Sequence, residues 1–361
     1  MNRRNPALSD RAADLALKAL AAFNLLFLVL AAFAAMLAFS ASQARAQEGP
    51  TACTGRDLLS ALERDDPARL AEIRAEAAGV ANGRGLLWRI DRDGVAPSWL
   101  FGTMHMADPR VVALGPRARE AFGAATTVVI ETTEVLDPAK AMAAMLADPE
   151  LTMFTDGTTL MSLVPDEERA AVEAALGARG IPPASVARMK PWMISAMVAL
   201  PACELARKAA GAPVLDAVLA TEGQAAGKAL GGLETIADQL GAMASLPMEF
   251  HVRGLIDTLK LGDAVDDVIE TMIALYLDGE TAMFWPFFRA ALPAGESADA
   301  AGFSAFEETM VTARNRIMAE RAMPFIDAGG AFIAVGALHL PGEEGLIELL
   351  RKKGYRVEAS R

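Results

Sequence analysis

The chain has few of the residues from which metal and nucleic-acid sites are usually built. Among its 361 residues are three histidines and two cysteines, and the formal net charge is −12. A surface that binds phosphates needs a positive field, so the acidic balance argues against a nucleic-acid partner, and no basic run with interleaved aromatic residues offsets it. The two cysteines are not spaced as C-x-x-C, which excludes the usual cysteine-based zinc site.

Apolar sequence is abundant instead. Apolar residues make up 53% of the chain and charged residues 22%, which suits one large core, with or without a helical insertion, and not a disordered chain. The 18 methionines include no M-x-x-M cluster beside a histidine, so we expect them to fill the core and not to bind copper.

Residues 1–46 have the layout of an export signal. An apolar run from about 19 to 39 is followed by Ala44-Arg45-Ala46, which resembles a signal-peptide cleavage site. The run is also long enough to remain as an uncleaved anchor. The basic residues that precede it would stay inside, so residues 47–361 are expected in the periplasm or otherwise outside the cytoplasm. They would be released by cleavage near Ala46, or held at the inner membrane through residues 19–39.

The two cysteines, Cys53 and Cys203, are an even pair in a chain that carries an export signal. In an oxidising compartment such a pair suggests one disulfide. It would join the start of the mature chain to a helix in its middle. Neither cysteine has neighbours arranged for nucleophilic chemistry, so we expect the bond to be structural.

Short apolar and β-branched segments predict strands at both ends of the mature chain and one in its middle. The expected strands are 86–89, 98–102, 126–130, 229–233, 332–335 and 355–358. Asp93-Gly94 predicts a hairpin between the first two. The region from about 137 to 321 has mostly helical periodicity, with one long helix over 302–323. We therefore predict an α/β domain with a mixed central sheet, flanking helices and a large helical insertion.

Two of the three histidines occur in the same pattern, Gly-x-x-His, at the ends of two predicted strands. The motifs are Gly102-Thr103-Met104-His105 and Gly336-Ala337-Leu338-His339. Glu131 directly follows a third strand, and Glu234 a fourth. In parallel α/β sheets, ligands bind beyond the carboxyl ends of the strands. These side chains are therefore expected to form one site.

Two neutral histidines and one carboxylate form a ligand set with open positions, suited to a catalytic divalent ion such as zinc, manganese or cobalt. A bound water would lose a proton near neutral pH and attack a carbonyl group. Without metal, His105 could act as a general base oriented by Glu131. The competing interpretation is that both histidines only hold loops. The third, His251, lies in a helical stretch without such a context and is expected to be structural.

Three further residues have both a functional and a structural interpretation. Asp108, before Pro109, is a turn former that could also support His105 from behind. Arg314 could bind a substrate carboxylate, pair with Glu131, or form a surface ion pair on a long helix. Glu234 could join the site, cap a helix or form a salt bridge.

Several segments resemble the TraB/GumN family, which includes the TIKI metalloproteases. The resemblance is carried by W-L-F-G-T-M-H-M-A-D-P-R-V at 99–111, by V-V-I-E-T-T at 128–133 and by the stretch 332–358 around the second motif. Shorter likenesses to the GumN-type branch are Cys53-x-Gly55-x-x-Leu58, Lys190-Pro191-Trp192, Pro201-Ala202-Cys203-Glu204, Leu215-Asp216, Gly232-Leu233-Glu234-Thr235 and Arg314-Asn315. Together they cover roughly residues 53–358.

The resemblance implies that His105, Glu131 and His339 are the metal-binding and catalytic residues. It also implies a fold related to erythromycin esterase-like hydrolases, where a histidine and a glutamate activate water, and to ChaN-like haem-binding proteins. The expected function is hydrolysis of a peptide or of a small-molecule ester or amide at the cell envelope. The alternatives are a non-catalytic envelope protein that binds haem or another metal chelate through the same histidines, and an accessory protein with a vestigial site.

Overall fold

The computed structural model describes residues 53–291 and 300–360. The predicted export signal or anchor, residues 1–46, lies outside these described residues. Within them, no helix combines the length and the apolar character that a membrane span requires.

A mixed six-stranded sheet forms the centre of the fold, with strand order β4-β3-β5-β2-β1-β6. Strands β2, β5, β3 and β4 are parallel to one another, and β1 is antiparallel to both of its neighbours. The predicted hairpin and α/β class are confirmed. The strands are β1 Leu87–Asp91, β2 Ser98–Thr103, β3 Thr127–Ile130, β4 Ala229–Gly232, β5 Ala331–Gly336 and β6 Arg356–Ala359.

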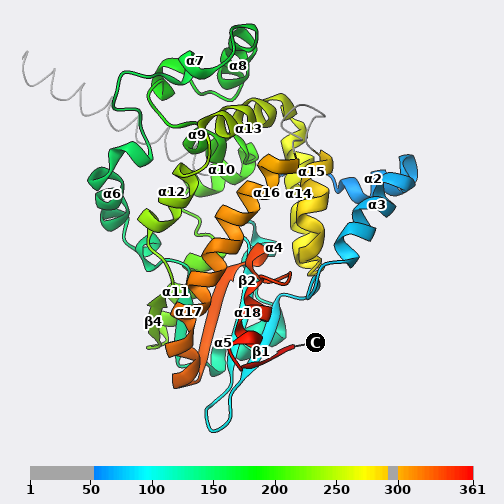
Figure 1. Ribbon diagram of the computed structural model, residues 1–361, viewed down its shortest axis with the longest axis vertical. Helices are drawn as coiled ribbons and strands as arrows, with labels where there is room; N and C mark the ends of the chain where they lie inside the picture. Colours follow the sequence, from blue (N-terminus) through cyan, green and yellow to red (C-terminus); the bar gives the residue numbers. More distant parts are fainter. Residues whose placement is uncertain (1–52, 292–299, 361) are drawn as a thin grey trace, which may run out of the picture. The chain divides into compact units, whose positions relative to one another are not determined.

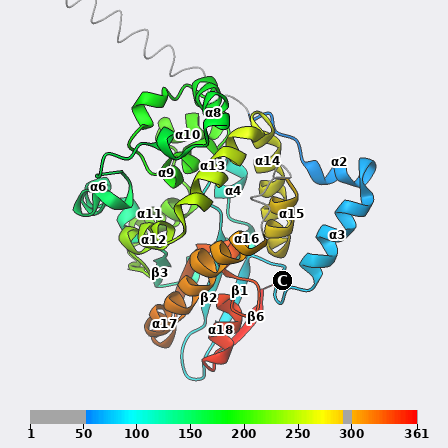
Figure 2. The same cartoon turned by 45° about the horizontal axis from the view of Figure 1, so that its top comes forward.

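The central strands are buried on both faces because helices cover each side of the sheet (Figures 1 and 2). Side chains alternate along a strand, so Phe332 and Ala334 of β5 join one core cluster while Ile333 and Val335 join the other. The first cluster includes residues of α5 Pro116–Ala124, α11 Leu215–Ala225 and α14 Ala264–Leu277; the second includes residues of α17 Ala313–Ala328 and α18 Leu346–Lys352.

Between β3 and β5 the regular secondary structure of the described chain is helical, apart from β4 and one isolated bridge. The remaining α-helices of this region are α6 Pro138–Ala147, α7 Leu160–Leu163, α8 Asp166–Ala178, α9 Pro191–Val198, α10 Ala202–Ala209, α12 Ile236–Ala244, α13 Met248–Leu261, α15 Phe284–Ala291 and α16 Ala300–Glu307. Helices α7, α8, α9 and α13 have a core of their own, and Figure 1 shows them (green) away from α17 and α18.

Helices α2 Leu58–Asp65 and α3 Pro67–Ala78 precede the sheet, and α4 Pro109–Val112 follows the first motif. Helix α3 begins at Pro67, and the Asp66 side chain caps it by accepting from the Arg69 N–H group. A disulfide joins Cys53, just before α2, to Cys203 in α10, across 150 residues of sequence. It is the pairing that the sequence suggested.

The long helix predicted over 302–323 is divided in the structure. Helix α16 and α17 are separated by a π-helical turn, η6, over Glu308–Thr312. An extra residue in a helical turn changes the direction of every later side chain by about 100°. π-turns of this kind are frequently found at functional sites. Here the turn immediately precedes Arg314 and Asn315, and both of these face the ends of the central strands.

Candidate active site at the ends of the central strands

The two Gly-x-x-His motifs meet because β2 and β5 are neighbours in the middle of the sheet. Gly102 pairs with Val335, and Thr103 with Gly336. A Cβ atom on Gly102 would lie 2.8 Å from a methyl carbon of Leu340 and 3.1 Å from Ala337, so the second motif packs directly on the first. A glycine is required there by this close approach.

Gly336 forms the floor between the three predicted site residues. A Cβ atom added to it would lie 3.2 Å from Glu131 Oε1, 3.5 Å from His339 Cδ2 and 3.7 Å from His105 Nε2. Its N–H group also donates to Glu131 Oε1 at 2.7 Å. The glycine therefore leaves room for the polar atoms and binds one of them.

His105, Glu131 and His339 converge on one point although they come from three different strand ends. Glu131 Oε1 lies 3.9 Å from His105 Nε2 and 3.8 Å from His339 Nε2. Glu131 and His339 side chains are each 6% exposed, while that of His105 is 58% exposed. The site is thus buried on one side and open to solvent at His105.

Each histidine is oriented from behind through its Nδ1 atom. His105 Nδ1 lies 2.8 Å from Asp216 Oδ2, and His339 Nδ1 lies 2.7 Å from Asn315 Oδ1. The Asn315 amide is oriented by its Nδ2 group, which donates to the Glu344 carbonyl, so its oxygen accepts from the ring. Both Nδ1 atoms are therefore donors, and both Nε2 atoms are directed at Glu131.

The second oxygen of Glu131 is held by a buried arginine. Arg314 Nη2 donates to Glu131 Oε2 at 2.8 Å and to Glu234 Oε2 at 2.6 Å, and its Nε donates to Glu234 Oε1 at 3.0 Å. Gln239 Nε2 donates to Glu131 Oε2 at 3.0 Å. Arg314 also binds the Met310 carbonyl in the π-helical turn. Glu131 is left with Oε1 as the atom that faces the histidines.

The protonation states follow from these contacts. Burial opposes ionisation of Glu131, but the two histidines and Arg314 outweigh it and hold its pKa at about 2. Desolvation of the His105 ring, which is still partly exposed, is outweighed chiefly by Asp216, which raises the pKa to about 9. Burial lowers the pKa of His339 to about 4, although Glu131 opposes the shift. At neutral pH, His105 holds the proton and His339 is neutral.

Asp108 does not support His105, contrary to expectation. It is 2% exposed and binds Arg110 and Arg207, with its oxygens 3.0 and 3.1 Å from their nitrogens. The carboxylate that does hold His105 is Asp216, which also accepts from the Thr103 hydroxyl at 2.8 Å. Asp108 caps α4, and its side chain is engaged by these two arginines.

Sequence reasoning did not assign Asp216, Asn315 or Gln239 to the site. Asp216 and Asn315 occur in two of the dipeptides that carried the family resemblance, and this was the sequence signal for a role in the site. No sequence signal indicated such a role for Gln239. His251 lies in α13, where its ring packs on Trp192 and its Nε2 atom lies 2.9 Å from the Met243 carbonyl.

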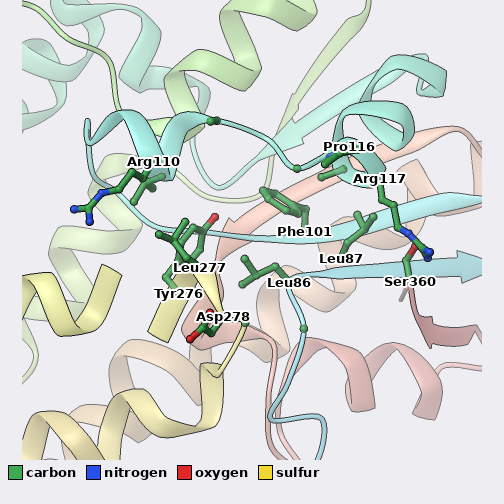
Figure 3. A pocket seen from close by; sticks show the side chains of 16 residues that line it. Leu86, Leu87, Phe101, Arg110, Pro116, Arg117, Tyr276, Leu277, Asp278 and Ser360 are labelled. Atoms are coloured by element: carbon green, nitrogen blue, oxygen red, sulfur yellow. The ribbon is translucent and has the colours of Figure 1, made fainter. Parts of the chain in front are cut away.

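The candidate site opens into a cavity of about 270 Å³, lined by His105, Ile130, Glu131, Thr132, Val135, Lys208, Val214, Asp216 and Gln239. A larger cavity of about 600 Å³ lies elsewhere, between β1, β2 and the end of α14 (Figure 3). No histidine lines it, and its Arg110 is bound to Asp108 and Glu270. The smaller cavity is therefore the one with groups suited to proton transfer.

In the described residues, no group of three or more His, Cys, Asp or Glu side chains is arranged so that it could hold a metal ion as it stands.

The protein has an α/β fold in which paired histidine motifs lie at the ends of the central strands. The sequence profile of the TraB/PrgY/gumN family matches residues 86–359, which include both motifs. The chain belongs to this family, as the resemblance of its motifs predicted.

Curated relatives with significant similarity are distant. Metalloprotease TIKI1 of Homo sapiens is 24% identical over 313 residues, which cover 75% of this chain and 61% of the relative. Metalloprotease TIKI2 of Danio rerio is 25% identical over 75% of this chain and 60% of its own length. The chain thus spans about 60% of the relatives that it matches. No solved structure matches it.

Proposed function

We propose that this protein is a metal-dependent hydrolase that cleaves a peptide bond, or a small-molecule ester or amide, at His105, Glu131 and His339. The observation that carries the proposal is the convergence of both Nε2 atoms on the single oxygen Glu131 Oε1, at 3.9 and 3.8 Å. The relatives named metalloproteases support the same class of reaction.

The donor chemistry of the three residues suits a divalent ion. His339 is neutral and donates through Nδ1, so its Nε2 lone pair faces a carboxylate oxygen. Two acceptors directed at each other across 3.8 Å favour a cation or a proton donor between them. A divalent ion would be held by His105 Nε2, His339 Nε2 and Glu131 Oε1. A bound ion would also replace the proton that His105 holds.

When bound, a divalent ion would supply a Lewis acid that lowers the pKa of a coordinated water and polarises a substrate carbonyl. The chain's own residues orient the site. Asp216 and Asn315 fix the direction of the two imidazole rings, and Arg314 with Gln239 keeps Oε2 of Glu131 away from them. Glu131 is ionised at neutral pH, so Oε1 can join the two Nε2 atoms as the anionic ligand.

We propose that the protein acts outside the cytoplasm. The Cys53–Cys203 disulfide supports this, because structural disulfides persist in oxidising compartments. The basic and apolar layout of residues 1–46 supports it as well.

Metal analysis of the purified mature domain tests the proposal. Wild type should retain close to one equivalent of zinc, manganese or cobalt after dialysis, and a His339→Ala variant should retain far less. His251→Ala is the matched control, because it removes the third histidine without touching the site. Peptide and ester hydrolysis should be lost on chelation and in Glu131→Gln. Equal metal content in wild type and His339→Ala would contradict the proposal.

The exposed ring of His105 also allows the alternative that this is a haem-binding protein without catalysis. Titration with hemin separates the two. A sharp Soret shift that disappears in His105→Ala, without any hydrolysis by the metal-loaded protein, would favour the alternative.

A further inference from the structure

Two cationic side chains line the cavity at the candidate site, His105 and Lys208, and His105 is paired with Asp216. The arginine at the base of the site, Arg314, is already neutralised by Glu131 and Glu234. Lys208 is exposed, and among the described residues no hydrogen bond or ion pair engages its ammonium group. Its positive charge is therefore available to whatever enters the cavity.

Helix α10, which carries Lys208, is tied to the loop that follows the first motif. Glu204 Oε1 accepts from the Ala107 N–H at 2.5 Å. Arg207 Nη1 lies 3.1 Å from Asp108 Oδ2. The disulfide at Cys203 joins the same helix to Cys53. These links fix the backbone that bears the lysine relative to the catalytic histidine of that loop.

A lysine in the last turn of a helix has a simpler explanation, which is favourable interaction with the helix dipole. Arg207 stands in the same turn and supplies that interaction as well. The dipole does not require the Lys208 side chain to line a cavity, and a lysine turned to open solvent would serve equally. The helix dipole therefore does not explain why the Lys208 side chain lies beside the candidate site.

The other residues that line the cavity indicate which chemical groups a ligand bound beside the lysine would carry. Val135 and Val214 contribute aliphatic surface, and Ile130 packs in the core at the cavity wall. Glu131 is bound by Arg314, and Asp216 by Thr103 and His105. An apolar group with an attached anion matches this surface, because the lysine is the one charge there without a partner on the described chain.

We propose that Lys208 selects the substrate by binding a carboxylate, so that preferred substrates carry an aliphatic residue next to a carboxylate group. The proposal rests on the proposed function, because it takes the cavity beside His105 and Glu131 as the place where substrate binds. The carboxylate can belong to an acidic side chain or to the end of a peptide, and the chemistry at the lysine is the same in both cases.

Three acetylated peptides separate these sources: acetyl-Leu-Val-Glu-amide, acetyl-Leu-Val-Gln-amide and acetyl-Leu-Val-Gln with a free carboxyl end. Their binding to the mature protein is measured by calorimetry at low salt, which does not depend on cleavage. We expect the peptide with the recognised carboxylate to bind about fivefold tighter than the neutral peptide, the upper range for a partly exposed ion pair. Salt should weaken this preference.

Variants at Lys208 test whether this preference depends on the charge of the lysine. Lys208→Gln should abolish the preference, Lys208→Glu should reverse it, and Lys208→Arg should retain it. Lys140→Gln is the matched control, since Lys140 is a 73% exposed lysine of α6 outside the cavity lining, and it should leave the preference unchanged. Equal binding of all three peptides by wild type, or an unchanged preference in Lys208→Gln, would overturn the proposal.

The same peptides distinguish this proposal from the proposed function. A preference that depends on Lys208, without cleavage by protein loaded with zinc, manganese or cobalt, would refute the hydrolase and keep the carboxylate site. Cleavage of all three peptides at equal rates, unchanged in Lys208→Gln, would keep the hydrolase and refute the carboxylate site.

Discussion

Replacing Arg314 by methionine should lower the free energy of unfolding by about 3–5 kcal/mol, the usual cost of removing one partner from a buried ion pair. The arginine side chain is 11% exposed and binds the carboxylates of Glu131 and Glu234, whose side chains are 6% and 2% exposed. Methionine fills similar volume but leaves Glu234 without its counter-charge and Glu131 with that of His105 alone. Because a domain of this size is stabilised by only about 5–15 kcal/mol, the variant should be marginally folded.

Urea unfolding at pH 7, followed by circular dichroism, measures the loss. Arg316→Met is the matched control: Arg316 lies two residues away on α17, is 51% exposed, and binds Glu308 and Glu344 at the surface. Exposed pairs contribute about 0–1 kcal/mol, so this control should change little.

A second variant identifies the cause of the loss. If uncompensated charge is responsible, adding Glu234→Gln to Arg314→Met should recover part of the stability, because one buried charge is removed with its partner. A loss of unfolding free energy below about 1 kcal/mol in Arg314→Met would refute this account of the arginine. So would a double variant whose loss equals the sum of the losses of Arg314→Met and Glu234→Gln measured separately.

Three further predictions concern other parts of the fold. Replacing Cys53 and Cys203 by alanine should destabilise the protein by up to about 5 kcal/mol, the chain-entropy value for a loop of 150 residues, measurable by thermal unfolding of both forms. Burial lowers the pKa of His251, so its contribution to stability is complete above pH 6.5 and is lost as pH falls through the lowered pKa. The free energy of unfolding should therefore fall in this range by at most about 1.4 kcal/mol per pH unit on account of His251, and a His251→Gln variant should show a smaller fall. Asn315→Leu should weaken metal binding about 10–100-fold by freeing the ring of His339, as a competition titration would show, and unchanged affinity would contradict the orienting role.

The sequence predicted the strands because they depend on local pattern, and it predicted the meeting of the motifs because parallel strands end at the same edge of a sheet. Alternating or continuous apolar runs define strands, and the carboxyl ends of neighbouring parallel strands must lie at the same edge of the sheet. Glu131, directly after β3, was placed by the same rule. What the pattern could not supply was strand order, which makes β2 and β5 immediate neighbours.

The supporting residues were harder to find because they come from helices. Asp216 opens α11 and Asn315 opens α17, and their directions depend on how these helices pack on the sheet. The π-helical turn before Asn315 breaks the regular period, so helical periodicity alone misplaces the side chains beyond the turn. Asp108 is the turn former that the sequence indicated, but it does not support His105, because the arginines of α4 and α10 bind its side chain.

The base of the candidate site is main chain at Gly336, and main chain cannot change its outline by rotating a side chain. Whatever is accommodated there must match a rigid lower surface. Adaptation to different molecules is then left to the rim, where Val135, Lys208 and Val214 project from separate segments. Exchanging these rim residues would alter selectivity while the base stayed the same, which makes the rim the natural place to redirect this protein toward a chosen target.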